Sequence, residues 1–138
     1  MVTTSEGTVP SDVPEVVHAY FAAVNDRRFD DLAALLTEDA ELRPVGSPPR
    51  RGREDVAAYY PPLLAGFTSS FDDAHTFHVA GDVVTVEIAF RGETAEGRTV
   101  AFDAVDLFRL REGRIASIRI LYDVLEVARQ VRGDRRTD

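Results

Sequence analysis

The stretch Arg98–Leu110, RTVAFDAVDLFRL, decides the fold, because its composition and length are typical of a long β-strand. Alternation along it places one set of side chains on a common face: Phe102, Ala104, Asp106 and Phe108. An acid among apolar side chains is costly to ionise, so burial would raise the pKa of Asp106. A neutral Asp106 could then donate a hydrogen bond near neutral pH. The alternative is an Asp106 that lies in water or pairs with an arginine.

Segments of the same kind lie on both sides of this stretch. The sequence predicts further strands at Ala74–Ala80, Val83–Phe90 and Arg114–Tyr122. Residues typical of turns separate the four segments, at Gly81-Asp82, Gly92–Gly97 and Glu112-Gly113. This pattern predicts a meander of antiparallel hairpins.

The N-terminal half shows helical spacing instead. Apolar side chains three and four residues apart predict a first amphipathic helix, formed by Val13, Val16, Val17, Tyr20, Phe21 and Val24. Tyr20 is therefore expected on the buried face. A second helix is expected within Phe29–Leu36, and a third after Gly52 that Pro61-Pro62 breaks or kinks. Helices followed by strands predict an α+β fold, with three N-terminal helices packed on one face of a curved sheet.

Length and composition fit a single domain, since the chain has 138 residues of which 44% are hydrophobic. We expect a disordered leader over residues 1–10, one domain over residues 11–131 and a disordered tail over residues 132–138. No apolar stretch approaches the length of a transmembrane helix, and the first ten residues lack the basic end and apolar core of a secretory signal. These features predict a cytoplasmic protein that does not bind membranes.

The charged residues exclude several functional classes. A net charge of −8 argues against nucleic acid or anionic lipid as a partner, so we expect a small hydrophobic substrate. The chain has no cysteine, and all 16 basic residues are arginine, which excludes thiolate and lysine nucleophiles. His75 and His78 are three apart in a predicted strand and would lie on opposite faces. We therefore expect no metal site and no cofactor.

Four segments carry a resemblance to a known family: Val16–Tyr20 (VVHAY), Glu41–Gly52 (ELRPVGSPPRRG), Tyr59-Tyr60 and Asp106–Arg109 (DLFR). They resemble the ketosteroid isomerase group of the nuclear-transport-factor-two-like superfamily, also called SnoaL-like. The resemblance extends from about Val16 to Tyr122. It implies a cone-shaped α+β fold in which a strongly curved, mostly antiparallel sheet encloses one deep apolar pocket. It also implies a homodimer.

The resemblance assigns roles to individual side chains. In such isomerases a tyrosine and a neutral aspartic acid donate hydrogen bonds to the substrate oxygen. Tyr20 and Asp106 match these two donors, and Tyr60 matches a tyrosine that supports the first. The side chains expected to line the pocket are Val24, Tyr59, Tyr60, Val86, Ile88, Phe102, Ala104, Ile120 and Tyr122.

One position departs from the family pattern. The aspartate that shuttles the proton lies in an Asp-Pro-Val-Gly segment, and Arg43 occupies its position here. A guanidinium stays protonated and cannot act as a general base. The motif match puts Arg43 at the pocket mouth, where it would hold a substrate carboxylate or pair with Asp106. The alternative is a strand residue that faces solvent or pairs with Glu41.

Together these features predict a cyclase or isomerase of secondary (polyketide) metabolism that acts on a hydrophobic carbonyl compound. Tyr20 and Asp106 would polarise the carbonyl, and Arg43 would orient the substrate. Without a general base, cyclisation steered by pocket shape, including a cycloaddition, suits the site better than enolisation. The alternatives are a non-catalytic protein that binds a hydrophobic metabolite, a ketosteroid-type isomerase with its base relocated to Asp123, and an epoxide hydrolase.

Overall fold

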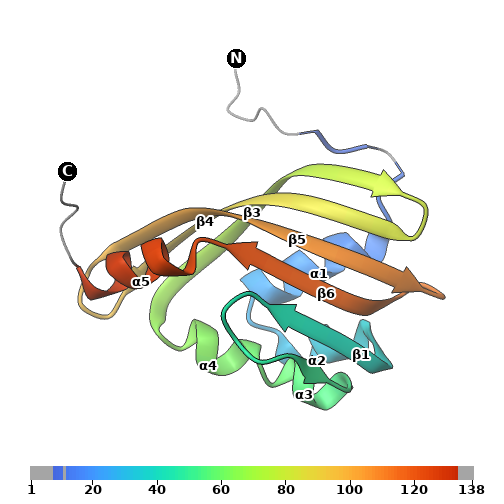
Figure 1. The fold of residues 1–138 in the computed structure, drawn as a ribbon, viewed down its shortest axis with the longest axis horizontal. Helices are drawn as coiled ribbons and strands as arrows, with labels where there is room; N and C mark the ends of the chain where they lie inside the picture. Colours follow the sequence, from blue (N-terminus) through green and yellow to red (C-terminus); the bar gives the residue numbers. More distant parts are fainter. Residues whose placement is uncertain (1–7, 11, 134–138) are drawn as a thin grey trace.

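The computed structural model describes residues 8–10 and 12–133 and contains one six-stranded sheet. Its strands are β1 (Leu36–Pro44), β2 (Arg50–Arg51), β3 (Phe67–Ala80), β4 (Val83–Thr94), β5 (Thr99–Arg111) and β6 (Arg114–Tyr122). Its helices are α1 (Glu15–Asn25), α2 (Phe29–Ala34), α3 (Arg53–Ala57), α4 (Tyr60–Leu64) and α5 (Val124–Arg132). Figure 1 shows α1 lying across one face of the sheet, with α2, α3 and α4 at the end nearest β1. The fold is α+β, as predicted.

The strands run in the order β2-β1-β6-β5-β4-β3. The predicted meander of antiparallel hairpins is confirmed for β3 to β6, although β3 begins at Phe67, seven residues before the expected start at Ala74. The exception to the antiparallel pattern is β1, which pairs with β6 in parallel, so the sheet is mixed. β3 is therefore an edge strand, and one of its two sides has no strand partner.

Helix α1 forms where the apolar stripe predicts it, and Val17, Tyr20, Phe21 and Val24 are buried against the sheet. The third predicted helix is divided into α3 and α4. Pro61 and Pro62 stand in the first turn of α4, where a missing backbone N–H costs little. The described chain thus has four short N-terminal helices in place of the three expected.

Helix α5 was not predicted. Asp123 caps it by accepting a hydrogen bond from the backbone N–H of Glu126 at 3.0 Å, and Gly133 ends it with a positive φ of 79°. None of its residues is buried. Its apolar residues Val124, Val127, Ala128 and Val131 nevertheless have helical spacing, so the sequence carried a signal for this helix that the prediction did not use.

One further expectation needs correction. The sheet is twisted and bent but is not strongly curled into a cone (Figure 1). Near the ends of the described chain, the Thr8 carbonyl accepts a hydrogen bond from Phe77 N–H at 2.7 Å, and α5 extends to Arg132. The rest of the expected leader and tail, residues 1–7 and 134–138, lies outside the described residues. Within the described ranges, no helix is long and apolar enough to cross a membrane.

Candidate active site

An apolar pocket lies between the sheet and the helices, with about 720 Å³ of empty space including its open mouth. Aromatic and aliphatic side chains make up most of its wall, from Val24, Tyr59, Leu63, Leu64, Phe67, Ile88, Phe90, Phe102, Ala104, Ile120, Tyr122 and Val127. Four polar side chains complete it: Tyr20, Tyr60, Asp72 and Asp106. A mostly apolar wall with a small number of polar groups is typical of a site for a small hydrophobic ligand.

The first polar feature is a pair of tyrosines from α1 and α4. The hydroxyl oxygens of Tyr20 and Tyr60 are 2.7 Å apart, and either group can be the donor. Tyr20 is 2% exposed and Tyr60 3% exposed. Burial raises the pKa of both phenols well above the usual 10.0, so both stay protonated at any physiological pH. One hydroxyl hydrogen forms the hydrogen bond between the two tyrosines. The other hydroxyl hydrogen is then available for donation to a ligand.

Asp106 on β5 is the second polar feature, and its burial was predicted correctly, since the residue is 4% exposed. Its neighbours across the two adjacent strands are apolar, Val86 on β4 and Ile120 on β6. Burial, and secondly the negative charge of Asp72, raise the pKa of Asp106 well above its usual value. Burial therefore favours the protonated form of this carboxyl group.

The Asp106 carboxyl group also has no side-chain partner among the described residues, since none of them forms an ion pair or a hydrogen bond with it. The same part of the chain contains no side-chain oxygen or nitrogen that is both fully enclosed and without a partner. It follows that the carboxyl oxygens of Asp106 open onto the pocket, where a ligand can meet them.

Asp72 on β3 is the residue that sequence reasoning missed. It lines the same pocket, and burial raises its pKa from 3.8 to about 6, so it is mainly ionised at neutral pH. No basic side chain is among the described residues that line this pocket. The expectation of a site without a general base did not take this second carboxyl group into account.

A β-bulge explains why Asp72 faces inward. Along β3 the inward residues Phe77 and Val79 pair with Val86 and Val84 of β4, and simple alternation from them would turn Asp72 outward. The pairing shifts by one residue between Ala74 and Thr76, which leaves His75 as an extra residue. The bulge reverses the alternation, so that Asp72 faces the pocket and Asp73 the outer surface.

Asn25, the last residue of α1, fixes the backbone at this point. Its side-chain nitrogen donates to the Asp72 carbonyl at 3.0 Å, and its side-chain oxygen accepts from the Asp72 N–H at 2.8 Å. The amide takes the place of a neighbouring strand at the free side of β3. It therefore helps to hold the Asp72 side chain toward the pocket.

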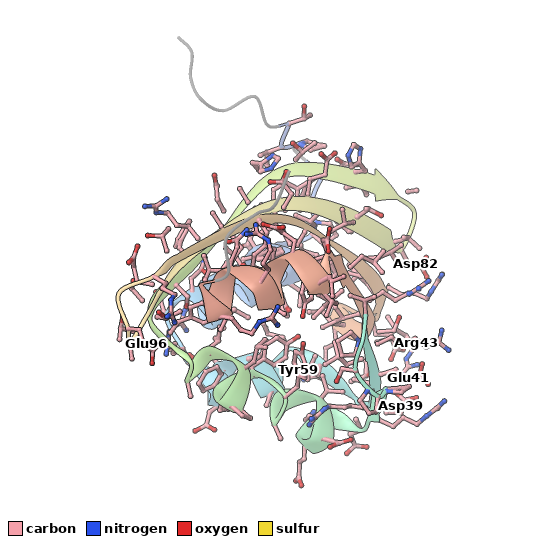
Figure 2. The ribbon with its side chains drawn as sticks, turned by 60° about the vertical axis from the view of Figure 1, so that its left-hand side comes forward. Asp39, Glu41, Arg43, Tyr59, Asp82 and Glu96 are labelled. Atoms are coloured by element: carbon pink, nitrogen blue, oxygen red, sulfur yellow. The ribbon has the colours of Figure 1, made fainter. Side chains whose placement is uncertain are left out.

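The structure places Arg43 away from the pocket, which corrects the expectation drawn from the motif match. On β1, Leu42 and Pro44 are buried while Arg43 between them is exposed. Figure 2 shows Arg43 and Glu41 on the outer side of β1, away from the side where Tyr59 lies. A shallow hollow there is lined by Glu41, Arg43, Leu107, Arg109, Ser117, Ile118 and Arg119. Glu41 forms its ion pair with Arg51, at 2.5 Å, and not with Arg43. The structure therefore supports the alternative in which Arg43 faces solvent.

The other predicted lining residues are found in the wall, except for Val86. Those in place are Val24, Tyr59, Tyr60, Ile88, Phe102, Ala104, Ile120 and Tyr122. Val86 is fully buried in the core, where it pairs with Asp106 across the sheet. Asp123, the suggested relocated base, caps α5 instead. In the described chain no three residues of the metal-binding types come together as a candidate metal site.

Comparison with known proteins agrees with this fold. Residues 17–118 match the family described as "SnoaL-like domain". A protein with a ketosteroid isomerase-like fold from Catenulispora acidiphila, solved with trimethylamine, is similar at 25% identity and a TM-score of 0.79, with 89% of this chain and 95% of that chain covered. A protein proposed to be a SnoaL-like polyketide cyclase from Jannaschia sp. CCS1 is similar at 22% identity and a TM-score of 0.80, covering 94% and 100% of the two chains. An LEH-like epoxide hydrolase from M. tuberculosis is similar at 23% identity and a TM-score of 0.72, covering 86% and 88%.

Proposed function

This chain belongs to the family of SnoaL-like domains, and we propose that it is an enzyme, a cyclase or isomerase that converts a hydrophobic carbonyl compound. One observation carries the proposal: Asp106 presents a buried, unpartnered carboxyl group, whose pKa burial raises, to an apolar pocket that also contains the Tyr20–Tyr60 pair. A structure shared with proteins proposed to be polyketide cyclases supports a polyketide-like substrate.

The donors would act on the carbonyl oxygen. A neutral carboxylic acid donates one hydrogen bond, and the tyrosine pair can donate a second. Both groups lie in a largely apolar wall, where water competes little and hydrogen bonds to a developing negative charge are strong. Donors held in place before the reaction stabilise charge on oxygen without reorganisation, and this effect is often the largest contribution to catalysis.

The same acid supports a second candidate reaction, the opening of an epoxide. The observation that favours it is the presence of both carboxyl groups in one pocket, since Asp106 can protonate the epoxide oxygen while Asp72 activates water. A structural relative is an LEH-like epoxide hydrolase. Conversion of a hydrophobic epoxide to a diol, with no reaction of ketones, would favour this candidate.

Binding of 2-naphthol tests the proposed donor site, because a phenol mimics the enol of a hydrophobic ketone. Calorimetric titration should show that Asp106→Leu weakens binding roughly tenfold or more. Leucine has a branched shape similar to that of aspartate but cannot donate a hydrogen bond. Asp106→Asn keeps an N–H donor and should bind more tightly than Asp106→Leu. The matched control is Asp103→Leu, at an exposed position of the same strand. Equal binding by the wild type and Asp106→Leu would contradict the donor site.

A further inference from the structure

We propose that Asp72 is the general base of this site and removes a proton from the carbon next to the substrate carbonyl. The inference rests on the proposed function and narrows its substrate class to carbonyl compounds with an acidic α C–H, such as 1,3-dicarbonyl compounds or β,γ-unsaturated ketones. Asp72 lies on β3, remote in sequence from Arg43, the position where the family pattern has its proton-shuttling aspartate.

The two carboxyl groups reach the pocket from different places on the sheet. Asp72 is paired with Phe90 on β4, which is paired in turn with Phe102 on β5. Asp106 lies four residues farther along β5, and no hydrogen bond joins the two aspartates. They are still close enough that charge on Asp72 raises the pKa of Asp106. Both side chains line one pocket without contacting each other through a hydrogen bond, so a substrate bound there can meet both of them.

Burial raises the pKa of both carboxyl groups. The pKa of Asp72 rises to about 6 through burial alone, and the pKa of Asp106 rises well above its usual value through burial and the charge of Asp72. The other titratable groups that line the pocket are all phenols, Tyr20, Tyr59, Tyr60 and Tyr122, and burial raises the pKa of each. Among the described residues of the wall, no basic side chain neutralises the Asp72 carboxylate. A base with a pKa just below the working pH is ionised and yet basic enough to accept a proton.

The local structure suits a base that must be held in place. Asn25 binds both backbone groups of Asp72, and the bulge at His75 turns its side chain inward. Beside Asp72 on the neighbouring strands, the aromatic rings of Phe90 and Phe102 stack at 4.8 Å between centroids and form part of the wall. A planar enone or aromatic polyketide ring fits against such a surface.

The proposed step balances without another reagent. The α C–H bond breaks, its proton goes to Asp72, and its electron pair forms the C=C bond of an enolate. The former π pair of the carbonyl moves to oxygen, which accepts hydrogen bonds from Asp106 and the tyrosine pair. Asp72 then returns the proton to the same carbon, to a conjugated carbon in an isomerisation, or to the alkoxide formed when the enolate carbon attacks a second carbonyl and closes a ring.

Exchange of the C1 protons of 2-tetralone in D2O, followed by NMR, tests this step directly. The wild type should accelerate exchange, and the rate should rise with pH through about 6 as Asp72 ionises. Asp72→Asn should lower the enzymatic rate by about 10² or more, the usual contribution of a general base. Asp73→Asn, the same change at the adjacent residue on the outer face, should leave the rate unchanged. Asp72→Asn should still bind 2-naphthol.

The outcomes separate the two proposals. Exchange by Asp72→Asn at the wild-type rate would overturn the assignment of the base. Tight 2-naphthol binding by a wild type that does not accelerate exchange would overturn it as well, and would leave the donor site standing. Binding of 2-naphthol that does not depend on Asp106 would overturn the proposed function and the base with it.

Discussion

The side-chain amide of Asn25 pairs with both backbone groups of Asp72, donating to its carbonyl at 3.0 Å and accepting from its N–H at 2.8 Å. A helix end thereby replaces the missing neighbour of an edge strand at the residue that we propose as the base. The contact joins the stability of the sheet edge to the chemistry of the pocket.

Replacing Asn25 by alanine should therefore have two effects. Loss of two hydrogen bonds should lower the free energy of unfolding by about 1–3 kcal/mol, measured by urea denaturation. A less restrained Asp72 can turn toward water, so the pH midpoint of 2-tetralone exchange should fall below about 6. A loss of stability with an unchanged midpoint would show that Asn25 has a structural role only.

Asp72 should also make the protein less stable as the pH rises. Its pKa is raised from 3.8 to about 6 on folding, so between these values the folded state holds more protons than the unfolded state. Stability from this group is complete below pH 3.8, falls as the pH rises to about 6, and is then constant. Asp72→Asn should remove this slope and be more stable than the wild type at pH 8, by on the order of 2 kcal/mol.

Thermal or urea unfolding at a series of pH values checks this prediction, with Asp73→Asn as the matched control. The difference between Asp72→Asn and the wild type should grow between pH 4 and about 6, whereas Asp73→Asn should follow the wild type. If the stability of Asp72→Asn and that of the wild type changed in parallel with pH, Asp72 would not be buried in the way described.

The Tyr20–Tyr60 pair should show strong coupling in a double-mutant cycle. Each single change to phenylalanine leaves the other hydroxyl without its protein partner in a buried site, at a cost of about 1–2 kcal/mol. The double variant leaves no orphan hydroxyl, so its loss of stability should be smaller than the sum of the two single losses. Additive losses in urea denaturation would contradict a direct hydrogen bond between the two phenols.

Arg43 should be dispensable for the site. Because its side chain lies on the outer face of β1, Arg43→Ala should change 2-naphthol affinity and 2-tetralone exchange by less than about twofold. Arg109→Ala, in the same outer hollow, is the matched control. A large effect of Arg43→Ala alone on either measurement would return Arg43 to the pocket mouth.

The difference between Asp106 and Asp72 shows how far sequence reasoning reaches. β5 is regular across Asp106, so simple alternation predicts its inward direction, and helical spacing does the same for Tyr20 on α1. Asp72 lies before a bulge on a strand that begins earlier than expected, and neither feature has a clear signal in a single sequence. Alternation through His75 gives the wrong face for residues 69–74, until a second register shift between Phe67 and Ser69.

Arg43 was misplaced for a different reason. A motif match transfers a position in the sequence, whereas the face of a strand depends on its pairing, and here β1 pairs with β6 in a register that opposes Arg43 to Arg119 on the outer side. Helix α5, whose Val127 lines the pocket, was missed although Val124, Val127, Ala128 and Val131 have helical spacing. The directions of site side chains on regular elements, such as Tyr20 and Asp106, were predictable from the sequence. The directions of Asp72 and Arg43, which depend on strand register, were not.

The ionisation states of the two aspartates are the most direct test of the central claim, that one pocket holds a protonated acid and an ionised base. Carbon-13 NMR of protein labelled at the aspartate carboxyl carbons measures them, with Asp72→Asn and Asp106→Asn to assign the two signals. We predict that the Asp72 signal titrates near pH 6, and that the Asp106 signal remains that of a protonated acid at pH 7. If both signals instead titrate close to the usual value of 3.8, the pocket holds two ordinary carboxylates and the proposed acid and base do not exist.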